Sequence, residues 1–187
     1  KQSLKAVAPL GSEYVQALDG GFNSRWVAVH ENKGKRSGAY SSGCYGTPPY
    51  MLMNWQDNLE NMFTLAHEAG HSMHSWFTRK NQPYTYGDYT IFVAEVASTC
   101  NEALLAHHLL SVEKSDDVRR YLINHQLEAF RTTFFRQTLF AEFEMIAHEL
   151  AQQRRPQAAA KLSEICLDLS KKHHADIVRG PGPAGIA

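Results

Sequence analysis

Apolar residues recur every three or four positions along most of the chain after residue 54, which is the spacing of one helix face. The pattern predicts a helix over about residues 59–77 and a second over about 90–110. A third begins near residue 115, where Ser115 and two acids provide a cap and first turn, and runs to about 152 with at most one break. A short fourth helix follows over 156–172. Five phenylalanines between residues 130 and 143 share the helical spacing, and we expect them to form core.

The first fifty residues follow a different pattern. Residues 2–18 fit short helical turns on either side of Pro9. Residues 26–30 and 37–42 are typical of short strands, with a polar, glycine-containing turn over 32–36 between them. The sequence therefore predicts a mainly α fold with a small β-hairpin. No repeat or linker is visible, so we expect one helix-rich domain over residues 1–179 and a flexible Gly- and Pro-rich tail over 180–187.

The charge balance excludes several classes of partner. Lys+Arg and Asp+Glu are both 19, so the formal net charge is zero, whereas nucleic-acid binders usually carry a basic excess. No apolar run approaches the roughly 20 residues of a membrane span. We therefore expect neither nucleic acid nor membrane as a partner. The three cysteines form no CxxC pair, which favours free thiols in a reducing compartment. Residues 1–10 lack the apolar centre of a signal peptide, so we expect a cytoplasmic location. The sequence does not indicate an oligomeric state.

The segment His67-Glu68-Ala69-Gly70-His71 carries the sharpest chemical signal. On a helix, residues four apart lie on one face about 6 Å apart along the axis, so both imidazoles can converge on one metal ion. Zinc is the ion expected for this HExxH pattern. The adjacent Glu68 carboxylate can hold a water molecule that is bound to the metal. Gly70 costs helix stability, which indicates that another backbone or a substrate approaches closely there.

A catalytic zinc site needs a third protein ligand. His74 shares the face of His67 but lies about 10 Å further along the axis, too far for one ion, so we expect a packing or supporting role. Glu95 is an acid between apolar residues, which is costly unless it is paired or bound to metal. Glu102, two turns later, is the rival ligand, or alternatively a partner that orients a ligand imidazole. The residues alone leave Glu95 and Glu102 open as the third ligand.

Several segments resemble one family, the oligoendopeptidase F branch of the thimet-oligopeptidase-like zinc metallopeptidases. The similarity covers most of the chain and includes the HExxH segment. The segments concerned are residues 34–41, 49–54, 63–75, 81–84, 91–99 and 135–138.

The resemblance implies a partial zincin-like catalytic domain with one Zn²⁺, bound by His67, His71 and Glu95, and Glu68 as the catalytic base. It also implies that the strand containing Gly38, Ala39 and Tyr40 edges the cleft and pairs with the backbone of a peptide substrate. The implied function is that of a zinc-dependent metalloendopeptidase. It would hydrolyse peptide bonds of oligopeptides, with a water activated by Glu68 at the zinc as nucleophile.

Two departures from the family pattern lead us to expect a fragment. Members of the family open with a long helical region, and they carry a His- and Tyr-rich segment beyond the position of the fourth helix. Neither is found in this sequence. The alternative function is therefore a catalytically silent, zinc-binding helical fragment of such an enzyme. The presence of Glu68 favours the enzyme, because a purely structural zinc site does not need a base.

Overall fold

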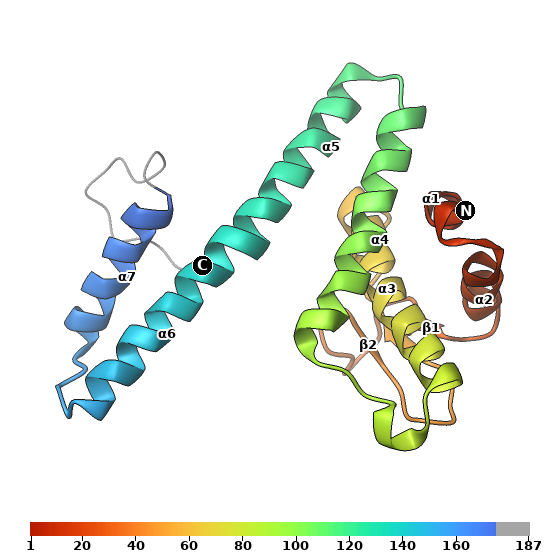
Figure 1. Ribbon diagram of the computed structural model, residues 1–187. Coiled ribbons are helices and arrows are strands. Elements are labelled where there is room, and N and C mark those ends of the chain that lie inside the picture. Colours follow the sequence, from red (N-terminus) through yellow and green to blue (C-terminus); the bar gives the residue numbers. More distant parts are fainter. Residues whose placement is uncertain (175–187) are drawn as a thin grey trace. The chain divides into compact units, whose positions relative to one another are not determined.

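The computed structural model describes residues 1–174 (Figure 1), and the tail expected over 180–187 lies outside them. The chain divides into two compact units, one over Lys1–Arg119 and a second that begins at Arg120, and each is described by itself. The single domain expected over 1–179 stays a prediction. The mainly helical fold with a small sheet is confirmed.

A small sheet packs against the helix over Leu59–Asn81 in the first unit. The helical elements are α1 (Gln2–Ala6), the 3₁₀ turn η1 (Ala8–Leu10), α2 (Ser12–Asn23), α3 (Leu59–Asn81), the 3₁₀ turn η2 (Tyr84–Tyr86) and α4 (Ile91–Val112). The side chain of Asn58 caps α3, because its Oδ1 accepts a hydrogen bond of 2.8 Å from the backbone N–H of Asn61. Helices α3 and α4, both predicted from the spacing of apolar residues, pack against each other.

The sheet differs from the expected hairpin. Strands β1 (Val27–Ala28) and β2 (Tyr40–Ser42) form within the predicted segments, but β3 (Tyr50–Leu52) lies between them. Strand β3 is parallel to β1 and antiparallel to β2. The backbone N–H of Met51 donates to the carbonyl of Trp26 at 2.7 Å, so the contact with β1 is made by a strand that the sequence did not predict. Strand β2 is consequently an edge strand.

The core of this unit joins the sheet to the buried face of α3. Its buried members are Val7, Leu18, Trp26, Met51, Ala69 and Met73. Burying each large side chain stabilises the fold by about 1.5–3 kcal/mol. The chain passes close to itself at Gly21, where a Cβ would lie 2.4 Å from the Trp26 ring. Together these contacts fix the buried side of α3, and the partly buried His67 and His71 lie outside this core.

The second unit contains the continuation of α5 (Asp116–Ala129), a π-helical segment η3 (Phe130–Phe135), α6 (Arg136–Gln152) and α7 (Ala159–His173). The single break expected in the third helix is therefore a π-helical turn. Glu142 joins α6 to α7 by accepting from Lys172 and contacting His173 at 2.8 Å.

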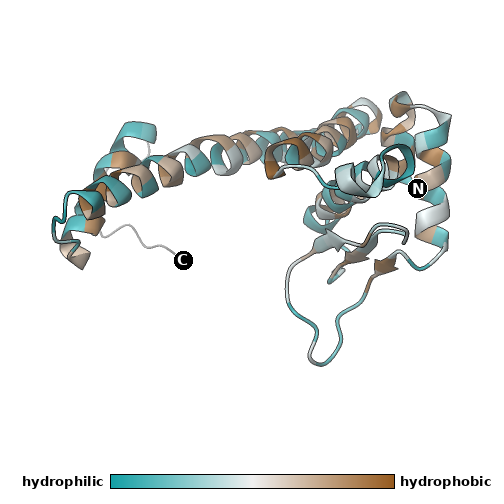
Figure 2. Cartoon of the chain, turned by 60° about the horizontal axis from the view of Figure 1, so that its bottom comes forward, coloured by the Kyte–Doolittle hydropathy of each residue, from teal (hydrophilic) through white to brown (hydrophobic). Residues whose placement is uncertain are grey.

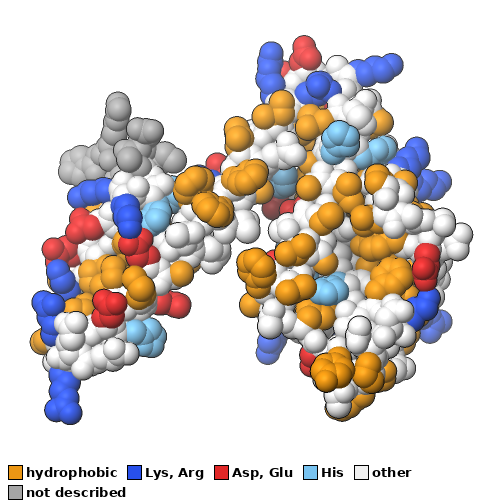
Figure 3. Space-filling view, in the orientation of Figure 1, with side chains coloured by type: hydrophobic (Ala, Val, Ile, Leu, Met, Phe, Trp, Pro, Cys, Tyr) orange, Lys and Arg blue, Asp and Glu red, His pale blue; other side chains and the backbone are white. Residues whose placement is uncertain are grey.

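The core of the second unit is not the phenylalanine stripe that the spacing predicted. Its buried residues are Leu139, Leu150, Ile165 and Leu169, because α7 packs on the face of α6 that carries the two leucines. Phe143 packs against this core, but the other four phenylalanines are 40–67% exposed. Polar and apolar residues alternate around these helices (Figure 2), and hydrophobic side chains are visible at the surface (Figure 3). The core prediction is wrong for those four.

Candidate metal centre

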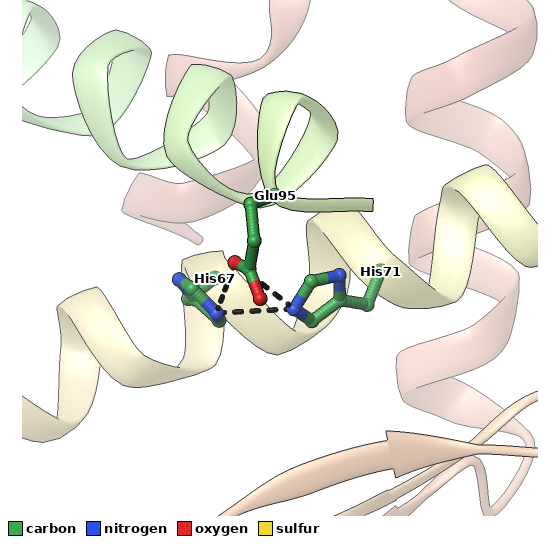
Figure 4. Close-up of side chains that lie close together, drawn as sticks. All are labelled: His67, His71 and Glu95. Carbon is green, nitrogen blue, oxygen red and sulfur yellow. Dashed lines mark hydrogen bonds and ion pairs between the residues drawn. The ribbon is translucent and has the colours of Figure 1, made fainter. Parts of the chain in front are cut away.

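Three side chains from two helices converge on one point. His67 and His71 project from α3, and Glu95 projects towards them from the first turns of α4 (Figure 4). The two Nε2 atoms are 3.1 Å apart, and Glu95 Oε2 lies 3.4 Å from that of His67 and 3.6 Å from that of His71. Within residues 1–174, these three form the one group of His, Cys, Asp or Glu side chains whose ligand atoms are close enough to hold a metal ion.

The spacing of these three atoms fits a tetrahedral ion. Bonds of 2.0–2.1 Å at tetrahedral angles place neighbouring ligand atoms about 3.3–3.4 Å apart. The three observed separations of 3.1, 3.4 and 3.6 Å bracket that value. Two imidazoles and one carboxylate with an open fourth position are also the donor set of catalytic zinc sites. The residues present therefore fit the metal that the sequence predicts.

Gly70 brings α4 close enough for Glu95 to reach the histidines. A Cβ at this position would lie 2.6 Å from the backbone oxygen of Ala97 and 2.7 Å from the Cα of Ser98. Such separations are not compatible with a side chain unless a backbone moves. The sequence predicted a close approach at Gly70, and the structure shows that the neighbour is the backbone of α4.

One face of α4 supplies more than the Glu95 carboxylate. Ser98 is fully buried, and its hydroxyl donates to Glu95 Oε2 at 2.8 Å. Glu102 Oε1 lies 2.5 Å from Nδ1 of His67, on the opposite side of the imidazole from Nε2. Glu102 is therefore placed as a partner of a histidine in the cluster and lies outside the three-residue group. Spacings of three and seven residues from Glu95 put all three side chains on one helix face.

His74 and the loop tyrosine Tyr89 support the opposite end of the site. The His74 imidazole lies outside the cluster and stacks on the Tyr89 ring at a centroid distance of 3.7 Å. The Tyr89 hydroxyl is 2.6 Å from the hydroxyl of Ser75, one residue after His74. Desolvation by burial lowers the pKa of His74. The arrangement agrees with a packing role for His74.

The two cluster histidines have opposite electrostatic environments. Burial opposes protonation of His67, but the hydrogen bond and charge of Glu102, with the charges of Glu68 and Glu95, outweigh it and raise the pKa of His67. Burial and the neighbouring His67 lower the pKa of His71, although Glu95 and a hydrogen bond to the backbone of Ala94 oppose this. A positive charge on the imidazole of His67 therefore favours the neutral form of His71.

Glu68 lies buried between the metal helix and the edge strand. It is 7% exposed, and its Oε2 has no hydrogen-bond partner among the described residues. Burial raises the pKa of Glu68, while His67 and a hydrogen bond from the backbone of Ser41 oppose that rise. One turn along α3, the fully buried hydroxyl of Ser72 lies 2.7 Å from that of Ser41. Strand β2 is thus attached to the face of α3 that carries Glu68.

The residues expected to bind substrate lie at this edge. Tyr40 is in β2, and Gly38 and Ala39 immediately precede it. A pocket of about 390 Å³ adjoins Gly38 and Ala39 and is also lined by Asn54 and Thr64. Thr64 is four residues before Glu68 on α3, so this lining residue lies about one helix turn from Glu68 along the helix.

The comparisons with known proteins define the class of molecule. The sequence model of Peptidase family M3 matches residues 3–182, and the chain belongs to this family. It is 58% identical over 173 residues to Oligopeptidase PepF of Bacillus subtilis, and 49% identical over 174 residues to Group B oligopeptidase PepB of Streptococcus agalactiae. These matches cover 92% and 93% of this chain but only 26% and 29% of the relatives.

Solved structures agree with this assignment. A chain from Chlamydophila abortus is 40% identical with a TM-score of 0.80, and the match covers 95% of this chain and 30% of that one. Oligoendopeptidase-F from Enterococcus faecium is 32% identical with a TM-score of 0.58, covering 96% of this chain and 24% of that one. The predicted relationship to oligoendopeptidase F is confirmed. The chain spans less than a third of each of these proteins.

Three serine hydroxyl groups that support the site were not predicted from the sequence. Ser98 is three residues after Glu95, and this spacing alone places it on the same helix face. Ser41 and Ser72 are far apart in sequence, and serine at such positions is common, so nothing in the pattern distinguished them.

No helix within residues 1–174 is long and apolar enough to cross a membrane.

Proposed function

We propose that the chain carries the zinc site and catalytic base of a metalloendopeptidase that hydrolyses peptide bonds of oligopeptides. The observation that carries the proposal is the convergence of His67, His71 and Glu95 at tetrahedral spacing beside a buried Glu68. Membership of a peptidase family and relatives named as oligopeptidases support the same reaction. In this proposal the two histidines and Glu95 hold one zinc ion, which supplies Lewis-acid polarisation of the scissile carbonyl.

Glu68 is suited to move the proton. Its buried Oε2 has no hydrogen-bond partner among the described residues, and an unpaired buried carboxylate oxygen is costly unless a further donor binds it. Burial raises its pKa towards the range in which a carboxyl both takes up and releases a proton. Glu68 removes a proton from the attacking water and delivers it to the leaving amine as the C–N bond breaks. The hydrogen bond from the backbone of Ser41 restricts where the carboxylate can turn.

The edge of β2 offers a place for the peptide backbone. Met51 directs its N–H to β1, so its neighbours along β3 pair with Tyr40 and Ser42. The backbone of Ser41 faces away from β3, where its N–H donates to Glu68. Ala39, two residues earlier, faces the same way. An extended substrate can add as a strand here, with a side chain directed to the pocket beside Ala39. We therefore propose Gly38, Ala39 and Tyr40 as substrate-binding residues.

Glu68→Gln tests the proposal directly. The variant keeps the size of the side chain but removes the base, so hydrolysis of a fluorogenic peptide by the complete gene product should fall by about 100- to 10,000-fold. Zinc content should not change, because Glu68 lies outside the ligand group. The matched control is Glu144→Gln, at an exposed position on α6, which should keep full activity.

Other outcomes would redirect the proposal. Unchanged hydrolysis by the Glu68→Gln protein would exclude Glu68 as the base. A wild-type gene product that binds zinc but hydrolyses none of a broad set of oligopeptides would support the silent zinc-binding alternative. Cytoplasmic location stays a prediction, and the three free cysteines agree with it.

A further inference from the structure

We propose that Glu102 is a positioning residue that holds His67 with Nε2 directed at the metal position. The inference rests on the proposed zinc site and extends it, since Glu102 is outside the ligand group. Its carboxylate lies 2.5 Å from Nδ1 of His67, a distance typical of a strong, charge-assisted hydrogen bond. The contact spans 35 residues of sequence and joins α4 to the metal helix α3.

The hydrogen bond selects one tautomer of His67. An ionised carboxylate has no proton to donate, so Nδ1 must carry the proton and donate it to Glu102. In the neutral imidazole, Nε2 is then left with its lone pair, and Nε2 is the atom that lies 3.1 Å from His71 and 3.4 Å from Glu95. Without Glu102 the imidazole is free to exchange tautomers and to rotate, and both movements remove the lone pair from the cluster.

The surroundings make this bond effective. The side chains of His67 and Glu102 are 28% and 26% exposed, so water competes only partly for either group. Glu102 lies on the same face of α4 as Ser98, which donates to the Glu95 carboxylate at 2.8 Å. The backbone of Ala94, also on α4, accepts from the imidazole of His71. Helix α4 thus supplies the ligand Glu95 and also a hydrogen-bond partner for each of the three proposed ligands.

Cobalt(II) binding separates positioning from general stability. Cobalt(II) adopts the same tetrahedral geometry and reports ligand arrangement through its visible absorption bands, and its affinity can be measured by competition with a chelator. Glu102→Ala should weaken cobalt binding about 10- to 100-fold. At saturating cobalt its bands should also differ in position or intensity from those of the wild type, which a merely structural role would not cause. Glu102→Gln retains an acceptor and should lie between the two.

The controls distinguish the possible failures. Glu144→Ala, an exposed acid on α6, should leave affinity and spectrum unchanged. If the wild type binds cobalt and both Glu102 variants match it in affinity and spectrum, the positioning role is excluded while the metal site stands. If Glu102→Ala binds no cobalt while Glu95→Ala binds normally, Glu102 is a ligand and the inference is overturned. If the wild type takes up no cobalt or zinc, the metal site fails, and this inference fails with it.

Discussion

Individual side chains at the cluster are arranged in a way that favours a bound cation. Two imidazole nitrogens 3.1 Å apart, with a carboxylate oxygen at 3.4 and 3.6 Å, bring three electron-pair donors together. Such a group repels itself unless a proton or a metal ion lies between its members. The raised pKa of His67 and the lowered pKa of His71 are consistent with one proton taking this place when metal is absent. A divalent ion resolves the repulsion more completely.

The hydroxyl of Tyr14 donates to Asn101 Oδ1 at 3.0 Å. Burial raises the pKa of Tyr14 to about 12. The unfolded chain has the ordinary tyrosine pKa of about 10. The resulting stability is therefore complete below pH 10 and is lost as the pH rises through 12. It amounts to on the order of 2 kcal/mol.

Urea unfolding at pH 9 and pH 11 measures this loss. Tyr14→Phe should be less stable than the wild type at pH 9 by about 1 kcal/mol, because Asn101 loses its hydrogen-bond donor. The variant should then lose less stability than the wild type between the two pH values. Tyr84→Phe, at a position 77% exposed, should show the wild-type loss. If all three proteins lose the same amount, burial of Tyr14 does not control alkaline stability.

At the scale of elements, the site depends on how closely α3 and α4 cross. Gly70→Ala tests this, because the new methyl group would lie 2.6 Å from a backbone oxygen of α4. Displacing α4 should cost about 1–3 kcal/mol in unfolding free energy, more than the roughly 1 kcal/mol gained from the helix propensity of alanine. Glu95 moves with α4, so metal affinity should fall as well. Thermal unfolding and chelator competition measure the two effects.

The chain contains a matched control for this substitution. Gly20 lies in α2 with no atom near the position of a Cβ, so Gly20→Ala should stabilise the protein by up to about 1 kcal/mol and leave metal binding unchanged. A Gly70→Ala protein that gains stability in the same way and binds metal normally would show that the close crossing is not required.

The elements also show where sequence reasoning succeeds. Helices α3 and α4 and the HExxH spacing are local patterns, so they and the pairing of His67 with His71 were predictable. Strand β3 is only three residues long, and its pairing with β1 depends on segments more than twenty residues apart. The phenylalanines after residue 129 recur at helical spacing, but periodicity cannot tell which of them another element covers. The contact of Glu102 with His67 required the tertiary structure, although both possible roles followed from its position.

For the whole molecule, metal binding should be coupled to folding of the first unit. The ligands lie on two helices whose packing forms much of this unit, so an ion that binds only the folded state stabilises it by mass action. At zinc concentrations about 1,000 times Kd this amounts to about 4 kcal/mol. For a chain of this size, it should raise Tm by on the order of 10 °C relative to the protein in a chelator. Differential scanning calorimetry measures the shift.

Variants at two histidines indicate whether the shift comes from the site. His71→Ala should abolish it, and His148→Ala, at an exposed position on α6, should retain it. An equal shift in both variants would mean that zinc stabilises the chain elsewhere.

The most direct measurement is the zinc content of protein prepared without chelator, determined by elemental analysis on the wild type and on Glu95→Ala and Glu102→Ala. We expect about one zinc per wild-type chain and close to none in Glu95→Ala, because that variant loses one of three ligands. Glu102→Ala should retain zinc at saturating concentrations and lose it at lower ones. A wild-type chain without zinc, or a Glu95→Ala protein that keeps its zinc, would contradict the proposed centre formed by His67, His71 and Glu95.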